Sequence, residues 1–140
     1  MKINFLHKTN LRVRYGETDQ MGYCYYGNYA QYFEVGRVEA MREAGISYKS
    51  LEESGIMLPV STFEVQYKRP AKYDDLLTIT TCITEIQGAR LHFDYEIHNE
   101  DKQLIATAKT TLVFVTKETM RPTSPPDNFN NIISNYEEVK

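Results

Sequence analysis

The segment between Tyr15 and Tyr29 holds an acidic side chain in a glycine-rich loop that leads into a helical pattern. The acid is Asp19, whose carboxyl group has a reference pKa of about 3.9 and is ionised at neutral pH. A carboxylate can attack a carbonyl carbon or take a proton from an attacking water, and both routes build negative charge on the carbonyl oxygen. Amides at a helix N-terminus can stabilise that charge. The segment therefore predicts a site for attack on an activated carbonyl, while a simple turn role for Asp19 stays open.

A helix must hold this loop in place, and the residue spacing predicts one over residues 28–44. Apolar and small side chains recur there at helical intervals, which is typical of a helix packed on another layer. These residues are Tyr29, Phe33, Gly36, Ala40 and Ala44. Asn28 is a candidate N-cap and Gly45 a candidate C-cap. The small residues let a sheet approach closely, and residues 47–54 are expected to form one or two further turns.

Alternating apolar and polar residues predict strands on both sides of the helix. A short strand covers residues 11–15, and four long strands follow the helix at 63–67, 77–83, 91–97 and 103–116. The short turns between them indicate antiparallel pairing. The apolar sheet face needs a cover, so we expect an α+β fold in which a curved antiparallel sheet wraps around one long central helix. The sheet keeps an open edge, which pairing between two chains would close.

Length and composition indicate a single domain over residues 1–140, with a core at about residues 10–117 and an irregular tail at 118–140, in which 131–139 could form a short helix. The net charge of −3 and pI of about 5.6 disfavour nucleic acid as the main partner. No apolar run has membrane-spanning length, so we expect a cytoplasmic protein. The two cysteines and three histidines show neither a disulfide framework nor a metal-ligand cluster, so we expect no metal and no cofactor.

Three parts of the chain together resemble a known family. The loop follows a YxxTDxxGxxYxxNY pattern, residues 32–37 continue it as Tyr-Phe-Glu-Val-Gly-Arg, and residues 67–75 contain an Arg-Pro-Ala turn before the long strands. This combination resembles the hotdog-fold acyl-CoA thioesterases, most closely the 4-hydroxybenzoyl-CoA thioesterase/YbgC-like branch. The resemblance covers about residues 10–123 and implies the hotdog fold.

The resemblance also implies roles for the loop residues. Asp19 matches the family's catalytic acid, which acts as nucleophile or general base, and Tyr26 matches the residue at the helix N-terminus whose backbone amide polarises the thioester carbonyl. Gly27 adds a second amide, and Gly22 lets the backbone pass close to the acyl chain. Many YbgC-like proteins have histidine at the Tyr26 position, and the 4-hydroxybenzoyl branch has proline at the Gly27 position. The amide role survives these changes, but a histidine side-chain role does not.

Further candidates concern substrate binding. The full set is Gly22, Gly27, Asn28, Val60, Ser61, Thr62, Lys68, Arg69 and Pro70. Asn28 is foremost an N-cap and only secondarily a substrate contact. The basic turn at residues 68–72, which includes Lys72, either contacts a coenzyme A phosphate or is simply solvated. The family architecture implies that residues 60–62 line the cleft across a dimer interface. Glu34 is a rival catalytic acid, for which we favour a pair with Arg37 at i, i+3.

The leading interpretation is hydrolysis of an acyl-CoA thioester to a carboxylic acid and free coenzyme A. One alternative is hydrolysis of acyl carrier protein thioesters, with the basic turn facing an acidic carrier. Another is a non-catalytic acyl-CoA-binding domain, against which Asp19 argues. A hotdog dehydratase is disfavoured because the loop and helix contain no histidine. The family architecture implies a homo-oligomer, a dimer at least and commonly a homotetramer of two dimers.

Overall fold

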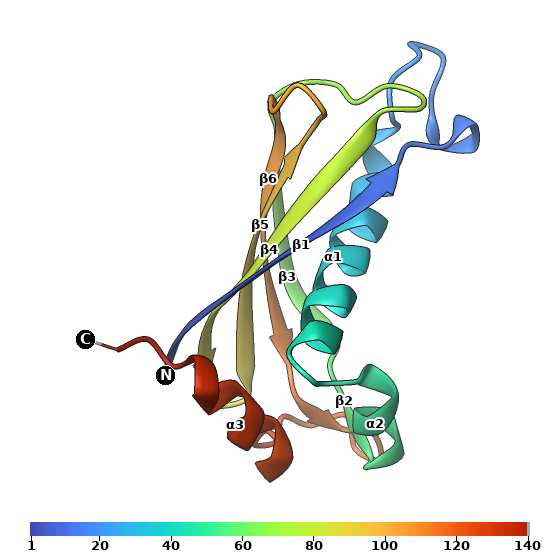
Figure 1. The fold of residues 1–140 in the computed structure, drawn as a ribbon. Helices are drawn as coiled ribbons and strands as arrows, with labels where there is room; N and C mark the ends of the chain where they lie inside the picture. Colours follow the sequence, from blue (N-terminus) through green and yellow to red (C-terminus); the bar gives the residue numbers. More distant parts are fainter. Residues whose placement is uncertain (140) are drawn as a thin grey trace.

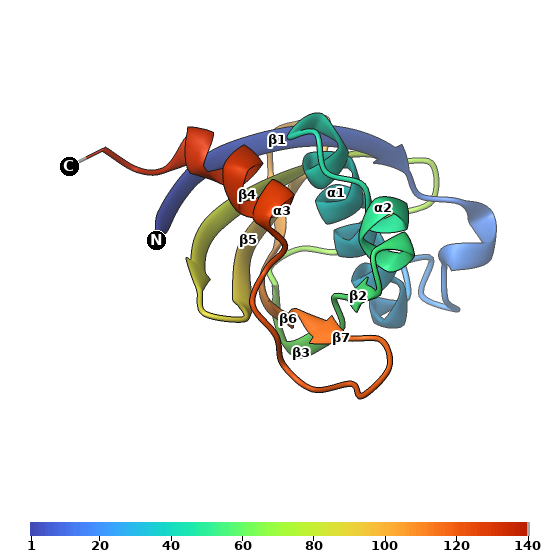
Figure 2. The same ribbon diagram turned by 90° about the horizontal axis from the view of Figure 1, so that it is seen from below.

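The computed structural model describes residues 1–139. Its main strands are β1 (Lys2–Arg12), β3 (Val60–Tyr67), β4 (Leu76–Gln87), β5 (Arg90–His98) and β6 (Leu104–Val113). The helices are α1 (Tyr29–Glu43), α2 (Tyr48–Glu53) and α3 (Asp127–Ile133), and β2 (Ile56–Met57) pairs with β7 (Val115–Thr116). The five main strands form one antiparallel sheet in the order β1-β4-β5-β6-β3, which curves around α1 (Figures 1 and 2). The predicted α+β arrangement of a curved sheet around one long helix is confirmed.

The contact between α1 and the sheet is close because the helix presents a glycine there. On β4, buried and partly exposed residues alternate, and the buried face carries Ile79 and Thr81. A Cβ atom on Gly36 would lie 2.6 Å from Thr81 Oγ1 and 2.7 Å from Ile79 Cγ2. The close approach predicted from the small helix residues is therefore confirmed.

The end of α1 follows its glycine. Gly45 has a φ of 92°, in the left-handed region that favours glycine. Its amide donates to Arg42 O at 3.0 Å, and the Ile46 amide donates to Met41 O at 2.8 Å, the pair of bonds of a Schellman motif. Gly45 thus ends the helix as the sequence predicts, and α2 supplies the expected further turn. No helix within residues 1–139 is long and apolar enough to cross a membrane.

Both ends of the chain contribute more to the core than the sequence indicated. β1 starts at Lys2 rather than near residue 11, and its register shifts between Lys2 and Phe5, where adjacent apolar residues also obscure the alternation. The tail expected to be irregular at 118–140 contains α3, which lies at the sheet end away from the 13–28 loop (Figure 1). Phe129 and Ile133 of α3 are buried, and the Phe129 ring packs on Phe114 with 4.9 Å between ring centroids. The prediction of an irregular tail and of a core limited to about 10–117 is therefore wrong, because tail side chains complete the apolar core.

Replacing Gly36 tests the close approach. We expect Gly36→Ala to lower the free energy of unfolding by about 1–2 kcal/mol, since an extra methyl in a packed contact costs about 1–3 kcal/mol and alanine in a helix returns up to about 1 kcal/mol. Urea denaturation measures the change. Gly16→Ala is the matched control, because a Cβ at Gly16 meets nothing within 4 Å. A Gly36→Ala protein as stable as the parent would contradict the packing.

Candidate active site

The loop before α1 folds back on itself as a small hairpin. Thr18 pairs with Cys24, and the Asp19 amide donates to Tyr23 O at 2.8 Å. The Gly22 amide closes the turn by donating to Asp19 O at 3.0 Å. Gly22 has a φ of 79°, in the left-handed region that glycine adopts without a steric penalty, so a glycine suits this turn. The hairpin returns the chain from Asp19 toward the start of α1.

One oxygen of the Asp19 carboxylate is fixed by this hairpin. Oδ1 accepts a hydrogen bond from the Met21 amide at 2.9 Å and from the Tyr23 amide at 3.3 Å. Within residues 1–139, no protein donor bonds to Oδ2, and the residue is half-buried. The turn role considered for Asp19 is thus real, yet it occupies only one oxygen. The arrangement orients the carboxylate and leaves its second oxygen available for chemistry.

The start of α1 offers two unpaired amides. A 3₁₀ turn over Tyr26–Asn28 runs directly into the helix, and the Asn28 amide donates to Tyr25 O at 2.9 Å. In the described part of the chain, the amides of Tyr26 and Gly27 donate to no protein acceptor. Such amides carry the partial positive charge of a helix N-terminus. The structure therefore places two donors where the sequence predicted the oxyanion site.

Asn28 does not cap the helix with its side chain, so the predicted N-cap role is wrong. Its backbone is already helical, with φ of −80° and ψ of −16°, and the side chain makes no capping bond. Instead, Asn28 Nδ2 donates to Glu17 O at 2.7 Å. The side chain ties the loop to the helix start.

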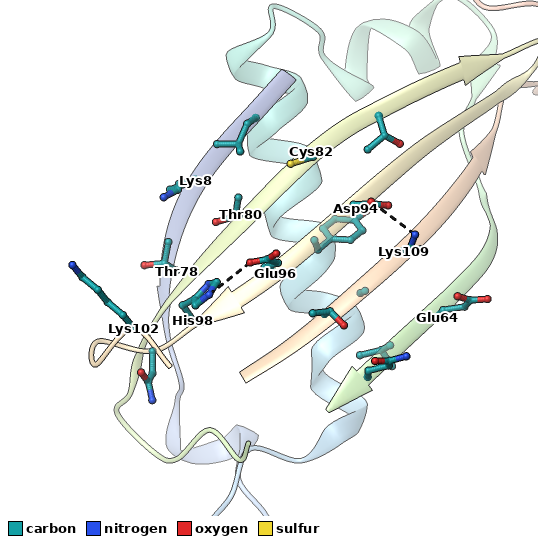
Figure 3. Close-up of a pocket in the computed structure, with 18 residues that line it drawn as sticks. Lys8, Glu64, Thr78, Thr80, Cys82, Asp94, Glu96, His98, Lys102 and Lys109 are labelled. Atoms are coloured by element: carbon teal, nitrogen blue, oxygen red, sulfur yellow. Dashed lines mark ion pairs between the residues drawn. The ribbon is translucent and has the colours of Figure 1, made fainter. Parts of the chain in front are cut away.

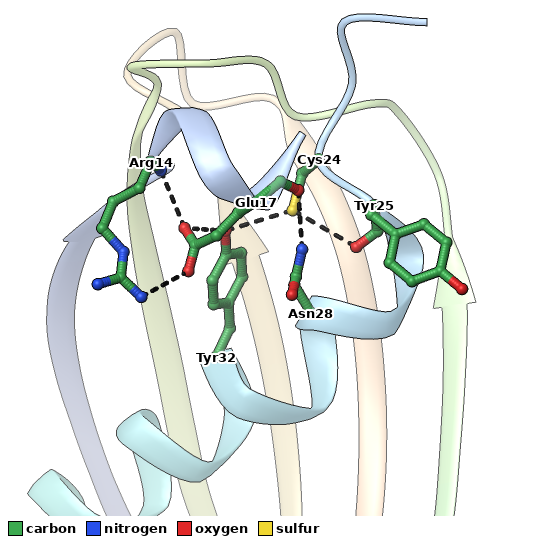
Figure 4. A network of polar contacts seen from close by, with 6 residues as sticks. All are labelled: Arg14, Glu17, Cys24, Tyr25, Asn28 and Tyr32. Atoms are coloured by element: carbon green, nitrogen blue, oxygen red, sulfur yellow. Dashed lines mark hydrogen bonds and ion pairs between the residues drawn. The ribbon is translucent and has the colours of Figure 1, made fainter. Parts of the chain in front are cut away.

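Glu17 is a buried acid that the sequence reasoning missed, and it forms a network with Arg14 and Tyr32 (Figure 4). Its carboxylate accepts bonds from the Arg14 amide at 2.9 Å, from Arg14 Nη2 at 3.0 Å and from Tyr32 Oη at 2.9 Å. Burial raises the pKa of the Glu17 carboxyl, but the bonds from Arg14 and Tyr32 outweigh burial and hold that pKa below its ordinary value. The signal in the sequence that could have indicated this network is the Arg14–Glu17 pair at i, i+3, which spans the start of the glycine-rich loop.

The basic turn at residues 68–72 lies beside this loop. The Cys24 amide donates to Ala71 O at 2.7 Å, and Tyr23 forms a β-bridge with Lys72. Within residues 1–139, the exposed side chains of Lys68, Arg69 and Lys72 form no ion pair. The structure therefore joins the basic turn, through Ala71 and Lys72, to the hairpin that holds Asp19.

Aromatic rings line the side of the loop that faces β3. The Tyr67 ring lies 6.2 Å from that of Tyr26 and 5.1 Å from that of Tyr29, between centroids. The opposite end of β3 begins at Val60, which stands seven residues from Tyr67, or roughly 23 Å at about 3.3 Å per residue. Within one chain, residues 60–62 are therefore not brought to the Asp19 loop.

The prediction of an ion pair between Glu34 and Arg37 is also wrong. Glu34 is exposed on α1, and no ion pair joins the two side chains in the described part of the chain. Arg37 instead lies beside the hydroxyl groups of Tyr48 and Tyr95. The spacing predicts that Arg37 pairs with Glu34 on the same helix, whereas packing directs the Arg37 side chain toward α2 and β5.

A depression of about 970 Å³ lies away from this loop, on the sheet face opposite α1 (Figure 3). It is lined by threonines of β4 and by charged residues such as Asp94 and Lys109, which approach each other at 4.0 Å. Asp19 and Tyr26 do not line it. Across residues 1–139, no group of three or more His, Cys, Asp or Glu side chains is arranged to hold a metal. The acid and the unpaired amides therefore make the loop, rather than this depression, the candidate active site.

Comparison with known proteins identifies the family. The sequence model described as "Thioesterase-like superfamily" matches residues 13–133. The chain belongs to this superfamily. Among thioesterase-like relatives, it is 32% identical over 133 residues to the putative acyl-CoA thioesterase YneP of Bacillus subtilis, covering 95% of this chain and 96% of that protein. It is also 32% identical over 121 residues to the acyl-CoA thioester hydrolase YbgC of Escherichia coli O157:H7, covering 86% and 90%.

Solved structures of this superfamily agree with the fold. A DHNA-CoA thioesterase from Staphylococcus aureus superposes with a TM-score of 0.89 at 32% identity, covering 93% of this chain and 89% of that one. A 4-hydroxybenzoyl CoA thioesterase complexed with 4-hydroxybenzoyl CoA has a TM-score of 0.83 at 22% identity, covering 91% and 98%. The similarity to the 4-hydroxybenzoyl CoA thioesterase, at 22% identity, is evidence for the fold alone. The predicted hotdog fold and the family resemblance are confirmed.

Proposed function

We propose that this chain is an acyl-CoA thioesterase that hydrolyses a thioester to a carboxylic acid and free coenzyme A. One observation carries the proposal: an oriented carboxylate with one available oxygen lies in a short hairpin that leads directly to two unpaired helix-start amides. The thioesterase-like relatives named for acyl-CoA substrates support the same chemistry.

Asp19 is the proposed catalytic acid. Its free oxygen either attacks the thioester carbonyl, forming an anhydride that water then cleaves, or takes a proton from a water that attacks directly. In both routes the carbonyl oxygen becomes negative, and the amides of Tyr26 and Gly27 stabilise it. Removal of a single oxyanion donor costs roughly 3–4 kcal/mol of barrier in other enzymes, so these amides supply a large term. The thiolate of coenzyme A is a good leaving group and needs no separate acid.

The basic turn is proposed to bind the phosphates of coenzyme A. Lys68, Arg69 and Lys72 are exposed, and the turn is hydrogen-bonded to the hairpin at Cys24. A thioester seated at Asp19 therefore has a cationic surface next to it for its nucleotide end. The same surface keeps the acyl carrier protein alternative open, since that partner is acidic.

A second copy of the chain is proposed to complete the site. β3 is a sheet edge, and all its residues except Val65 are exposed, among them the apolar Val60, Phe63 and Tyr67. Exposed apolar edges favour pairing with another strand. Antiparallel pairing of β3 with the partner's β3 sets residues 60–62 of one chain opposite the Tyr67 end of the other. This geometry supports the family-implied cleft position of residues 60–62, with a dimer, or a homotetramer of two dimers, as the assembly.

The catalytic proposal is tested with a panel of acyl-CoA and acyl carrier protein thioesters, scored by release of free thiol. We expect Asp19→Ala to lower kcat about 10²–10⁴-fold, the usual contribution of a positioned acid or base. Asp19→Asn keeps the shape of the side chain and is measured as well, and Asp19→Ala guards against slow hydrolysis of the asparagine amide back to aspartate. Single-turnover hydrolysis in labelled water then separates the routes, since label enters Asp19 only through an anhydride.

The matched control is Asp94→Asn, which removes a carboxylate from the opposite face of the sheet and should keep full activity. If the native protein turns over no thioester, or if Asp19→Ala keeps its activity, the catalytic proposal fails. If the protein hydrolyses only carrier-protein thioesters, its substrate is an acyl carrier protein thioester and not an acyl-CoA.

Removing the charges of the basic turn tests the phosphate contact. Arg69→Ala and Lys72→Ala should each raise KM for acyl-CoA about twofold to fivefold, the effect of exposed ion pairs of about 0.5–1 kcal/mol. KM for the matching acyl-pantetheine, which lacks the nucleotide phosphates, should not change. Lys109→Ala on the opposite face serves as the control. An equal rise in KM for both substrates would refute a phosphate contact.

The assembly is tested by the molecular mass in solution at micromolar concentration. We expect at least a dimer, and we expect Val60→Asp to shift the mass toward the monomer, because a charge at a sheet edge opposes pairing. A wild-type protein that is strictly monomeric yet fully active would rule out the shared site.

A further inference from the structure

Glu17 joins the two halves of the proposed site without taking part in the proposed chemistry. It lies two residues before Asp19 along the loop. Its backbone carbonyl accepts bonds from the Tyr25 amide at 2.8 Å and from Asn28 Nδ2 at 2.7 Å. Tyr25 and Asn28 stand immediately before and after the two unpaired amides. The backbone of Glu17 is therefore bonded to both sides of the proposed oxyanion site.

The side chain of Glu17 anchors this arrangement to the core. Its carboxylate is bonded to Arg14, which directly follows β1 and Val13, and to Tyr32, one turn into α1 (Figure 4). Tyr32 is itself buried and accepts a bond from Cys24 Sγ at 3.3 Å. A buried carboxylate is costly unless it is paired and hydrogen-bonded, and these donors supply that compensation. Strand, hairpin and helix are thus connected through one side chain.

A glutamine could not replace this carboxylate on equal terms. Arg14 Nη2 donates to Oε2, whereas the Arg14 amide and Tyr32 Oη donate to Oε1. A glutamine would turn an N–H group toward one of these donors and leave that donor without its acceptor. The negative charge and the two acceptor oxygens are both used by the network.

We propose that Glu17 is a positioning residue, which fixes the separation between the Asp19 carboxylate and the amides of Tyr26 and Gly27. This inference rests on the proposed thioesterase function. Glu17 is not itself the reacting acid, because both its oxygens are bonded and only 9% of the residue is exposed. A displacement of about 1 Å between reacting groups can reduce a rate on the order of 100-fold, so small shifts of this anchor matter.

The experiment compares Glu17→Gln and Tyr32→Phe, each alone and in an Asp19→Ala background. Single-turnover hydrolysis is measured with the acyl-CoA that the wild type cleaves fastest, at a temperature where circular dichroism shows every variant folded. We expect Glu17→Gln to lower the rate about 100-fold and Tyr32→Phe about tenfold, with KM close to wild type. In the Asp19→Ala background, Glu17→Gln should have a much smaller effect, because residues that act as a unit are not additive.

Glu85→Gln is the matched control. Glu85 also carries an ion pair, with Lys2 at 2.9 Å, but at the other end of the sheet, so its loss should leave the rate unchanged. A wild-type rate in folded Glu17→Gln and Tyr32→Phe, or the same loss with and without Asp19, overturns the positioning role. If Glu17→Gln does not fold, Tyr32→Phe decides. Absence of any thioesterase activity in the wild type overturns the proposed function instead, and with it the substrate for which Glu17 positions the site.

Discussion

The chemistry proposed for this protein depends on a helix start whose first two amides have no partner within the described residues. Asn28 occupies the position where a capping side chain is expected, yet its amide group donates to the carbonyl of Glu17. The amides of Tyr26 and Gly27 precede Asn28 and begin the 3₁₀ turn, where backbone donors have no partner within the helix. The bond from Asn28 to Glu17 holds the loop against α1, next to these unpaired amides. The helix start thus offers two donors to a developing negative charge.

The rest of the fold supplies the rigidity that such an uncapped end requires. α1 is held against β4 by the close contact at Gly36 and ends in a Schellman motif at Gly45. The far end of the core is closed by α3, whose Phe129 packs on Phe114. Position and orientation of the helix are therefore set by contacts remote from the loop. Within the loop, the buried carboxylate of Glu17 is tolerated because Arg14 and Tyr32 donate hydrogen bonds to it.

Much of the fold could be predicted because its signals are local. The boundaries of α1 follow from helical spacing and from a glycine that adopts a positive φ, and the strands after it follow from alternation. Prediction failed where local patterns were broken or absent. The start of β1 contains adjacent apolar residues and a register shift, and α3 is stabilised by burial against residues distant in the sequence. The predicted partner of Arg37 is likewise local, Glu34 three residues earlier, whereas the side chain lies beside Tyr48 of α2 and Tyr95 of β5.

The sequence by itself, through its resemblance to a known family, predicted the reaction class and the parts proposed to serve it: an acid in a glycine-rich loop, a helix start directly after it, and a basic turn before the long strands. These are properties of residue type and spacing, and they do not depend on remote contacts. Only the tertiary structure decided which amides are unpaired, which oxygen of Asp19 is available, and that Glu17 connects the two. Hydrogen-bond partners are chosen by the folded geometry, because each donor and acceptor has several candidates in the sequence and only one within reach in space.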